Sequence, residues 1–291
     1  MNSPSPPRGQ RRAETRADAI PLMDTEIQIL RIPSRFQPNA VHRRGAVVVR
    51  NSGPWTPTVH SLLRHLEAAG FAAAPRVVDS GFDPEGRETL TYIPGEFTQP
   101  GPWSHEGAAG VGLLLRELHD ATSSYTPPPN AIWQPVHSRA LGGHRRVISH
   151  CDLGPWNIVA RDGLPVALID WEYAGPVDPL VELAEACWLN AKLHDDYVAE
   201  REGLPPLAER ARQLRAIVDA YGLTRAQRRG FVDRIIEVAV STVAAEADMA
   251  GVGPETPLET LDPQVPWAMA WRARAAAWLF RHRRTLQSAL S

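Results

Sequence analysis

The sequence predicts an α+β protein with two lobes: a small N-terminal lobe with an antiparallel sheet and one helix, and a larger, mainly helical C-terminal lobe. Three observations support this expectation. Short β-branched segments surround one helical segment in the first third of the chain, a Pro-Gly pair interrupts the chain at residues 94 and 95, and helical periodicity dominates after Pro102. With 291 residues, the chain is long enough to bury the core of two packed lobes.

The N-terminal lobe is expected to span residues 25–95, after a tail at residues 1–24 that is rich in Pro, Ser and Arg and has no hydrophobic periodicity. One helix is expected between Pro57 and Gly70, because apolar residues recur there at helical spacing. Strands are expected where β-branched residues cluster. The expected strands are Ile27–Ile32, Gly45–Arg50, Arg76–Asp79 and Thr89–Ile93.

The C-terminal lobe is expected to span residues 96–291. A loop with strand-like flanks covers 146–170, and a helix should begin at Asp178-Pro179, since Asp caps helix N-termini and Pro fits the first helical position. Apolar periodicity then predicts three longer helices, at about 207–221, 225–248 and 265–290.

Composition and charge exclude several classes of protein. The chain is 43% hydrophobic and 22% charged, close to the average for soluble domains, and its formal net charge of -2 provides no basic field for nucleic acid. The two cysteines have no zinc-site spacing, and no apolar run is long enough for a secretory signal or a membrane span. We therefore expect a cytoplasmic protein with no nucleic-acid or membrane partner.

Two carboxylates and one amide follow apolar runs at a spacing that suits phosphoryl transfer. Asp152 follows an apolar strand, Asn157 comes five residues later, and Asp170 ends the next apolar run, 18 residues after Asp152. Phosphoryl transfer depends mainly on positioning and charge neutralisation. Asp152 is suited to accept the proton of an attacking hydroxyl, and Asn157 and Asp170 offer the hard oxygen ligands that Mg²⁺ prefers.

These residues occur in motifs that resemble those of the aminoglycoside phosphotransferase and choline kinase-like family. The segment His150–Asn157 matches its H-x-D-x-x-x-x-N loop, and Ile169–Trp171 matches its I-D-[FW] motif. Further similarity lies in the L-x-x-L-H helix at Leu115–His119, the hinge at Tyr92–Glu96, and Gly175–Pro179. The resemblance covers about residues 40 to 190.

The resemblance implies a bilobal, protein-kinase-like fold and a phosphotransferase that acts on an alcohol group of a small molecule. It implies Mg²⁺ as cofactor and ATP or GTP as co-substrate. Asp152 would be the catalytic base, and Asn157 and Asp170 would be the metal ligands. The hinge residues Tyr92 and Ile93 would bind the nucleotide.

The N-terminal lobe departs from the family pattern in two places. The family uses a lysine on a strand to hold the nucleotide phosphates, but the only lysine in this chain is Lys192. Arg50 is expected to replace it as a permanent cation. Arg50 has no evident carboxylate partner, because Val59 or His60 stands near the helix position at which the family has a glutamate that pairs with the lysine. The second departure is a missing glycine-rich loop, since no glycine lies between Ile29 and Gly45.

Two functional hypotheses therefore remain open. The first is an active small-molecule phosphotransferase, and the second is a non-catalytic binding or immunity protein with a degenerate nucleotide site. A third possibility, an unrelated helical scaffold with a chance motif match, would lack a five-stranded N-terminal sheet. The identity of the acceptor, the choice between ATP and GTP, and the oligomeric state are not determined by the sequence.

Several neighbouring residues have simpler explanations. We expect His150 to brace the loop through hydrogen bonds, and Cys151 to be a small loop residue and no nucleophile. Four acidic residues either form a wall for a cationic acceptor or belong to a solvated helix face. These four are Glu182, Glu185, Asp195 and Asp196.

Overall fold

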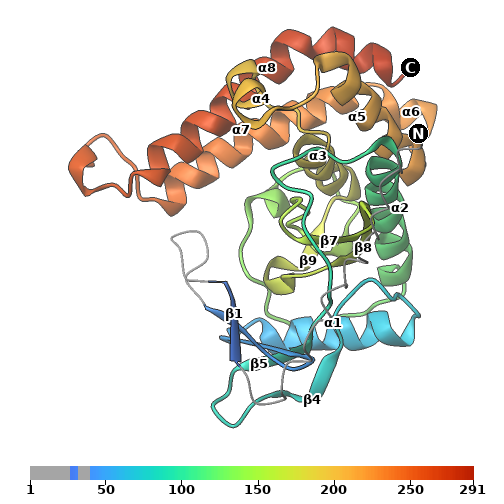
Figure 1. Ribbon diagram of the computed structural model, residues 1–291, viewed down its shortest axis with the longest axis vertical. Coiled ribbons are helices and arrows are strands. Elements are labelled where there is room, and N and C mark those ends of the chain that lie inside the picture. The colour runs from blue at the N-terminus through green and yellow to red at the C-terminus, as the bar shows by residue number, and fades with distance from the viewer. Residues whose placement is uncertain (1–26, 32–39) are drawn as a thin grey trace, which may run out of the picture.

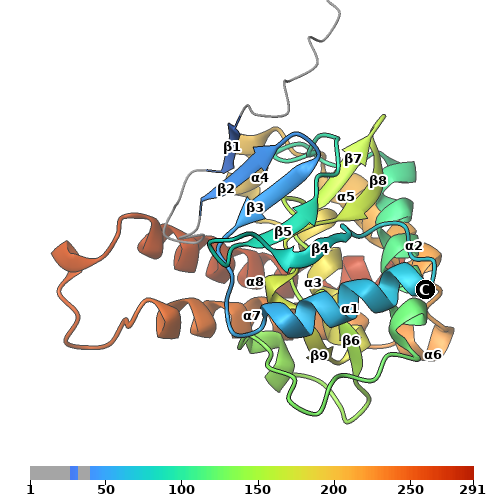
Figure 2. The same ribbon diagram turned by 90° about the horizontal axis from the view of Figure 1, so that it is seen from below.

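Five strands of the N-terminal lobe pair into one antiparallel sheet in the order β1-β2-β3-β5-β4 in the computed structural model of the protein (Figures 1 and 2). The structure describes residues 27–31 and 40–291, so the predicted tail at residues 1–24 lies outside the described residues. The strands are β1 (Ile27–Arg31), β2 (Val41–Arg44), β3 (Val47–Arg50), β4 (Val77–Phe82) and β5 (Glu88–Thr91). This sheet rules out the unrelated helical scaffold.

Strand β2 was missing from the sequence prediction, because its residues Val41–Arg44 include a histidine and two arginines and show no clean alternation. It forms a hairpin with β3, in which Arg44 pairs with Val47 across a two-residue turn. Gly45 begins this turn with a φ of 54°, which glycine adopts without steric cost. Backbone pairing on both sides, with β1 and β3, compensates for the weak side-chain pattern.

The single helix of the N-terminal lobe, α1 (Thr56–Ala68), packs against β4. It has Pro57 in its first turn, and Gly70 follows its end with a φ of 78°, as the sequence predicted. Leu62, Leu63 and other apolar residues of its inner face are fully buried in the core.

The C-terminal lobe contains seven helices and two short strand pairs within the described residues. Helix α3 lies at its centre and packs against α2, α5 and α7, so nearly all of its side chains are buried. The helices are α2 (His105–Thr122), α3 (Pro179–Asn190), α4 (Asp196–Glu202), α5 (Leu207–Tyr221), α6 (Arg225–Arg228), α7 (Phe231–Met249) and α8 (Gln264–Ala289). The strand pairs are β6 (Val147–Ser149) with β9 (Gly175–Val177) and β7 (Ile158–Arg161) with β8 (Leu164–Leu168).

The single helix predicted at 225–248 is wrong in one respect. Gly230 has a φ of 74° and separates a short helix, α6, from α7. A residue in the left-handed conformation breaks the run of helical hydrogen bonds. The apolar periodicity of the sequence continues across this break, so the periodicity alone did not show it.

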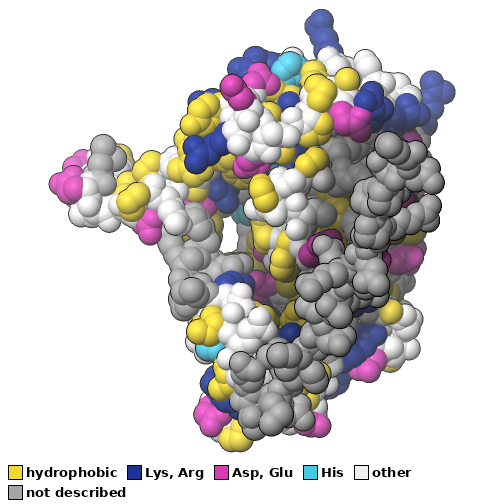
Figure 3. All heavy atoms as spheres, viewed as in Figure 1, with side chains coloured by type: hydrophobic (Ala, Val, Ile, Leu, Met, Phe, Trp, Pro, Cys, Tyr) yellow, Lys and Arg dark blue, Asp and Glu magenta, His cyan; other side chains and the backbone are white. Residues whose placement is uncertain are grey.

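Helices α7 and α8 pack along each other and project from the C-terminal lobe as a long hairpin (Figures 1 and 2). In the space-filling view, the surface is hollowed between this hairpin and the N-terminal lobe (Figure 3). Near its tip the hairpin exposes Met249 and Trp267. Within residues 27–31 and 40–291, no helix is both long and apolar enough to cross a lipid bilayer.

Candidate active site

Asp152 and Asn157 lie in the loop between β6 and β7, which we term the candidate catalytic loop (residues 150–157). The side-chain amide Nδ2 of Asn157 donates to Oδ2 of Asp152 at 2.8 Å and to its main-chain carbonyl at 2.9 Å. Cys151 has a φ of 63°, a conformation that non-glycine residues rarely adopt. Such strain is found mainly at functional sites, where the surrounding structure holds it in place.

Hydrogen bonds of buried side chains hold the candidate catalytic loop in place. Nε2 of His150 hydrogen-bonds the carbonyl of Ile169 at 2.8 Å, which confirms the predicted bracing role. Oε1 of Glu182, on α3, accepts from the backbone N–H of Cys151 at 2.7 Å. Its other oxygen lies 2.7 Å from Nε2 of His119 on α2. Helices α2 and α3 therefore fix the position of the loop.

The predicted acidic wall is wrong, and the solvated helix face that was its alternative applies only to Asp196, which is exposed at the start of α4. Glu182 and Glu185 are buried because α3 is covered on all sides. Asp195 caps α4 by accepting from the N–H of Val198 and forms an ion pair with Arg274. The fourth residue of the set, Asp196, accepts from the indole N–H of Trp278.

Asp170 follows β8 in a left-handed conformation, with a φ of 65°, and its carboxylate lies between two guanidinium groups. Nη1 of Arg31 donates to Oδ2 at 2.8 Å, and Nη1 of Arg50 donates to Oδ1. The structure thus brings Arg50 of the N-terminal lobe together with Asp170 of the C-terminal lobe.

The expectation that Arg50 has no carboxylate partner is wrong. Strands β3 and β5 are in register so that Arg50 stands opposite Glu88, and Nε of Arg50 donates to Oε2 of this residue. Nε2 of His60, on α1, lies 3.0 Å from Oε1 of Glu88. The carboxylate that pairs with Arg50 therefore comes from the neighbouring strand β5. His60 occupies the position on α1 at which the family has the glutamate partner.

The electrostatics of this ion-pair cluster follow from its burial and its charges. Burial alone would lower the pKa of Arg50, but the carboxylates of Glu88 and Asp170 outweigh it and raise this pKa. Burial would raise the pKa of Asp170, but Arg50 and Arg31 outweigh it and hold this pKa below its usual value. Arg50 and the carboxylates of Glu88 and Asp170 therefore carry full charge at neutral pH.

Asp152 has the opposite electrostatic environment, although it lies near enough to Asp170 to interact with its charge. Burial raises the pKa of its carboxyl to about 7, and the negative charge of Asp170 adds to this rise. Hydrogen bonding from Asn157 opposes the rise. A carboxylate with a pKa near 7 is a much better proton acceptor at neutral pH than an ordinary aspartate.

Asn157 and Asp170 are the predicted ligands of Mg²⁺, and their oxygens are of the right chemical type. Both oxygens of Asp170 nevertheless accept from guanidinium groups, whereas the hydrogen bond from Nδ2 of Asn157 to Asp152 does not involve the amide oxygen that would bind a metal. In the part of the chain that the structure describes, no group of three His, Cys, Asp or Glu side chains is arranged to hold a metal ion. As arranged here, the residues do not fit a divalent cation at Asp170.

Tyr92 and Ile93, the predicted hinge residues, follow β5 where the chain crosses between the lobes. The N–H of Tyr92 donates to the carbonyl of Ala46, at the start of β3, whereas Arg50 ends the same strand. Ala46 and Arg50 are four residue steps apart, which corresponds to about 13 Å along a strand. The region predicted to lack a glycine-rich loop falls partly on residues 32–39, outside the described residues.

The sequence pattern did not single out three residues near the site. Glu88 immediately precedes the predicted strand Thr89–Ile93, so its position one residue earlier in an alternating run was the available signal. Arg31 gave no such signal, because its contact with Asp170 depends on tertiary structure. Trp156 stands in the candidate catalytic loop with its indole folded over Gly154, at which any Cβ would collide with the ring.

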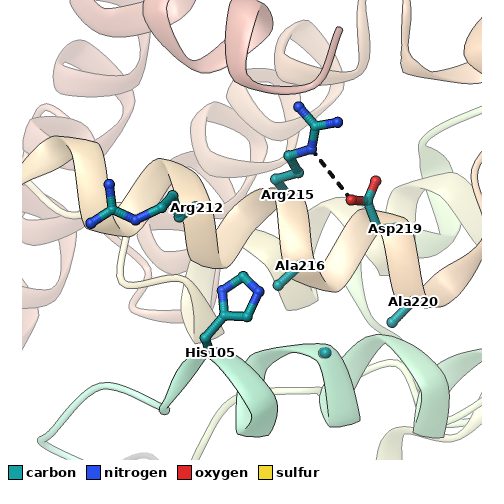
Figure 4. Close-up of a pocket in the computed structure, with 7 residues that line it drawn as sticks. His105, Arg212, Arg215, Ala216, Asp219 and Ala220 are labelled. Atoms are coloured by element: carbon teal, nitrogen blue, oxygen red, sulfur yellow. Dashed lines mark hydrogen bonds and ion pairs between the residues drawn. The ribbon is translucent and has the colours of Figure 1, made fainter.

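One surface hollow lies away from the candidate catalytic loop. It has a volume of about 360 Å³ and lies between α2 and α5 (Figure 4). The side chains of His105, Arg212, Arg215 and Asp219 line it, and Arg215 is paired with Asp219 there. None of the predicted site residues lines this hollow.

The two-lobed fold, the strand cation and the Asp152–Asn157–Asp170 arrangement define a kinase-like phosphotransferase architecture. The chain belongs to the phosphotransferase enzyme family, which includes the aminoglycoside phosphotransferases and choline kinase-like proteins. The model of this family matches residues 123–231. The chain is also 57% identical over 251 residues to the trifolitoxin immunity protein of Rhizobium leguminosarum bv. trifolii, which covers 86% of this chain and 95% of the relative.

Solved structures show the same fold at low sequence identity. A choline/ethanolamine kinase family protein from Mesorhizobium loti has a TM-score of 0.57 and 19% identity, covering 92% of this chain and 94% of the other. A microcompartment-associated aminopropanol kinase has a TM-score of 0.60 and 13% identity, covering 91% and 94%. These likenesses establish the bilobal kinase-like fold.

Proposed function

We propose that this protein transfers the γ-phosphate of a nucleoside triphosphate, ATP or GTP, to a hydroxyl group of a small molecule. The observation that carries the proposal is Asp152, a partly buried carboxyl with a pKa of about 7 that Asn157 holds in place. At neutral pH about half of this carboxyl is ionised and ready to accept a proton. Family membership supports the same reaction class.

The proposed reaction is a direct transfer of the phosphoryl group from the nucleotide to the acceptor. The acceptor hydroxyl gives its proton to the carboxylate of Asp152, and its oxygen forms a bond to the γ-phosphorus. The bond from this phosphorus to the bridging oxygen breaks, and the nucleoside diphosphate leaves with that electron pair. Arg50 would hold the phosphates, and Tyr92 and Ile93 would hold the nucleoside at the hinge. No step is assigned to Mg²⁺, because the arginines take both oxygens of Asp170.

The proposed biological role is immunity or resistance to a toxic small molecule. The 57% identity to the trifolitoxin immunity protein supports this role. A second candidate mechanism, protection by binding without phosphoryl transfer, is favoured by the pairing of Asp170 with two arginines. Asp152 distinguishes the two mechanisms, because only transfer needs a base at this position.

The test uses a trifolitoxin-sensitive Rhizobium strain that expresses either the wild-type chain or Asp152→Asn. Phosphoryl transfer predicts protection by the wild-type chain and its loss in the variant at equal protein level. It also predicts that trifolitoxin incubated with the purified wild-type protein and ATP or GTP gains the mass of one phosphoryl group. Full protection by Asp152→Asn, with no change in toxin mass, would establish the binding mechanism instead.

A further inference from the structure

Asp170 stands where the family places a metal ligand, yet its carboxylate is clamped by two arginines from the N-terminal lobe. Arg31 ends β1 and reaches Oδ2 at 2.8 Å, while Arg50 ends β3 and reaches Oδ1. Arg50 is held a second time by Glu88, whose other oxygen contacts His60. A carboxylate gripped on both oxygens is not available to a metal ion unless one arginine withdraws.

The four charges that are paired directly in this cluster balance, and the carboxylate of Glu172 lies near enough to interact with Arg50, Arg31 and Asp170. Two guanidinium groups face two carboxylates, those of Glu88 and Asp170, and the side chains of Arg50, Glu88 and Asp170 are almost fully buried. A divalent cation on Asp170 would place two more positive charges beside both arginines, where low polarity strengthens the repulsion. The two arginines therefore disfavour a further cation at Asp170, and the case for an anion depends on the hydrogen-bond donors that they offer.

The arginines also suit phosphate chemically. Guanidinium groups have planar donor pairs that bind phosphate oxygens through two parallel hydrogen bonds, and they keep their charge at any physiological pH. Among the described residues, Nε of Arg31 is buried and has no hydrogen-bond partner. A buried N–H group without a partner is costly, and a phosphate oxygen would satisfy it.

We propose that Arg31 and Arg50 replace the divalent cation, so that this cleft binds the triphosphate of a nucleotide as the metal-free anion. The inference rests on the proposed function for the assignment of the cleft to a nucleotide. The proposal also accounts for the absence of a lysine on β3. The ammonium group of a lysine is a point charge, whereas the planar donors of a guanidinium group can contact Asp170 and a phosphate at the same time.

The experiment is calorimetric titration of the purified full-length protein with ATP, GTP and inorganic tripolyphosphate, in EDTA and again in Mg²⁺. We expect at least one of the three to bind in EDTA, with an affinity that Mg²⁺ does not increase. Arg31→Gln should weaken binding in EDTA by about tenfold to a hundredfold, the effect of one lost hydrogen bond between charged groups. Arg44→Gln, an exposed arginine at the far end of the β1–β2 pair, is the matched control and should leave affinity unchanged.

Three outcomes would overturn the inference: no binding of any of the three anions in EDTA, binding that Mg²⁺ strengthens, or an affinity in EDTA that Arg31→Gln does not change. Arg31 decides the test because its side chain is partly exposed at the end of the edge strand β1, so its replacement should not unfold the protein. Arg50→Gln is a second variant, used only if its thermal melt matches the wild type.

Failure of the proposed function has a different signature. If trifolitoxin is not phosphorylated and Asp152→Asn still protects, the transferase proposal fails, but binding in EDTA that depends on Arg31 would still uphold the inference. If the toxin is phosphorylated and nucleotide binding requires Mg²⁺, the transferase proposal stands and the inference falls.

Discussion

Replacing Asp152 by asparagine should stabilise the folded protein at alkaline pH while removing transfer activity. The partly buried carboxyl has a folded-state pKa of about 7 in place of the ordinary 3.8. The folded state therefore binds this proton more firmly than the unfolded state does. By linkage, the stability of the wild-type protein falls as pH rises from about 4 through about 7. Asparagine carries no charge, so the variant lacks this loss.

The size of the effect follows from the same two values. At about 1.4 kcal/mol for each pH unit, the difference between 3.8 and about 7 corresponds to about 4 kcal/mol. Asp152 is only partly buried, so solvent screening reduces the figure to about 2 kcal/mol. Asparagine can still accept the hydrogen bond from Nδ2 of Asn157, so no other contact needs to be lost.

The assay is urea unfolding of both proteins at pH 4 and at pH 8. We expect nearly equal free energies of unfolding at pH 4 and a variant that is more stable by about 2 kcal/mol at pH 8. Asp248→Asn, at an exposed position on α7, is the control and should not change the pH dependence. A variant no more stable than the wild type at pH 8, or a difference that is equal at both pH values, would refute the reasoning about Asp152.

Two further predictions concern buried carboxylates outside the candidate catalytic loop. Glu88→Gln leaves Arg50 without its strand partner and should lower the free energy of unfolding in urea by about 3 kcal/mol, as is typical for a broken buried ion pair. Glu85→Gln, at an exposed position, is its control. An equal effect of the two substitutions would contradict the role of Glu88. Glu182→Gln should cost about 1 to 3 kcal/mol at pH 7, because its carboxylate accepts from Cys151 N–H and contacts His119. Burial would raise the pKa of Glu182, but His119 outweighs it and lowers this pKa, so the cost should shrink as pH falls below about 4. A cost that stays constant down to pH 3 would show that the charge of Glu182 does not matter.

The sequence located the candidate catalytic loop because its essential contacts are local. Asp152 and Asn157 are five residues apart, so the spacing of the motif already implies that one side chain can hold the other. The helix cap at Asp178 was predicted for the same reason, and its side chain accepts from the N–H of Leu180. Interactions within one loop or one helix turn depend on residue type and spacing, both of which the sequence shows.

The sequence misjudged α3, where the environment of each side chain decides its role. Glu182 and Glu185 look like residues of a solvated helix face, but α3 is enclosed by α2, α5 and α7. Burial raises the pKa of Glu185 well above its usual value, and the charge of Asp152 adds to this rise. No pattern within α3 itself indicates which helices will cover it.

By itself, the sequence determined the family, the bilobal kinase-like fold and the residues of the candidate catalytic loop, because these follow from short motifs and from the order of strands and helices. Only the tertiary structure decided that Glu88 stands opposite Arg50, a pairing set by the register of β3 and β5. It also decided that Arg31 and Arg50 close on Asp170, across 139 and 120 residues of chain. Contacts at such separations depend on how strands pair and lobes pack. The local spacing of residues does not indicate these long-range contacts.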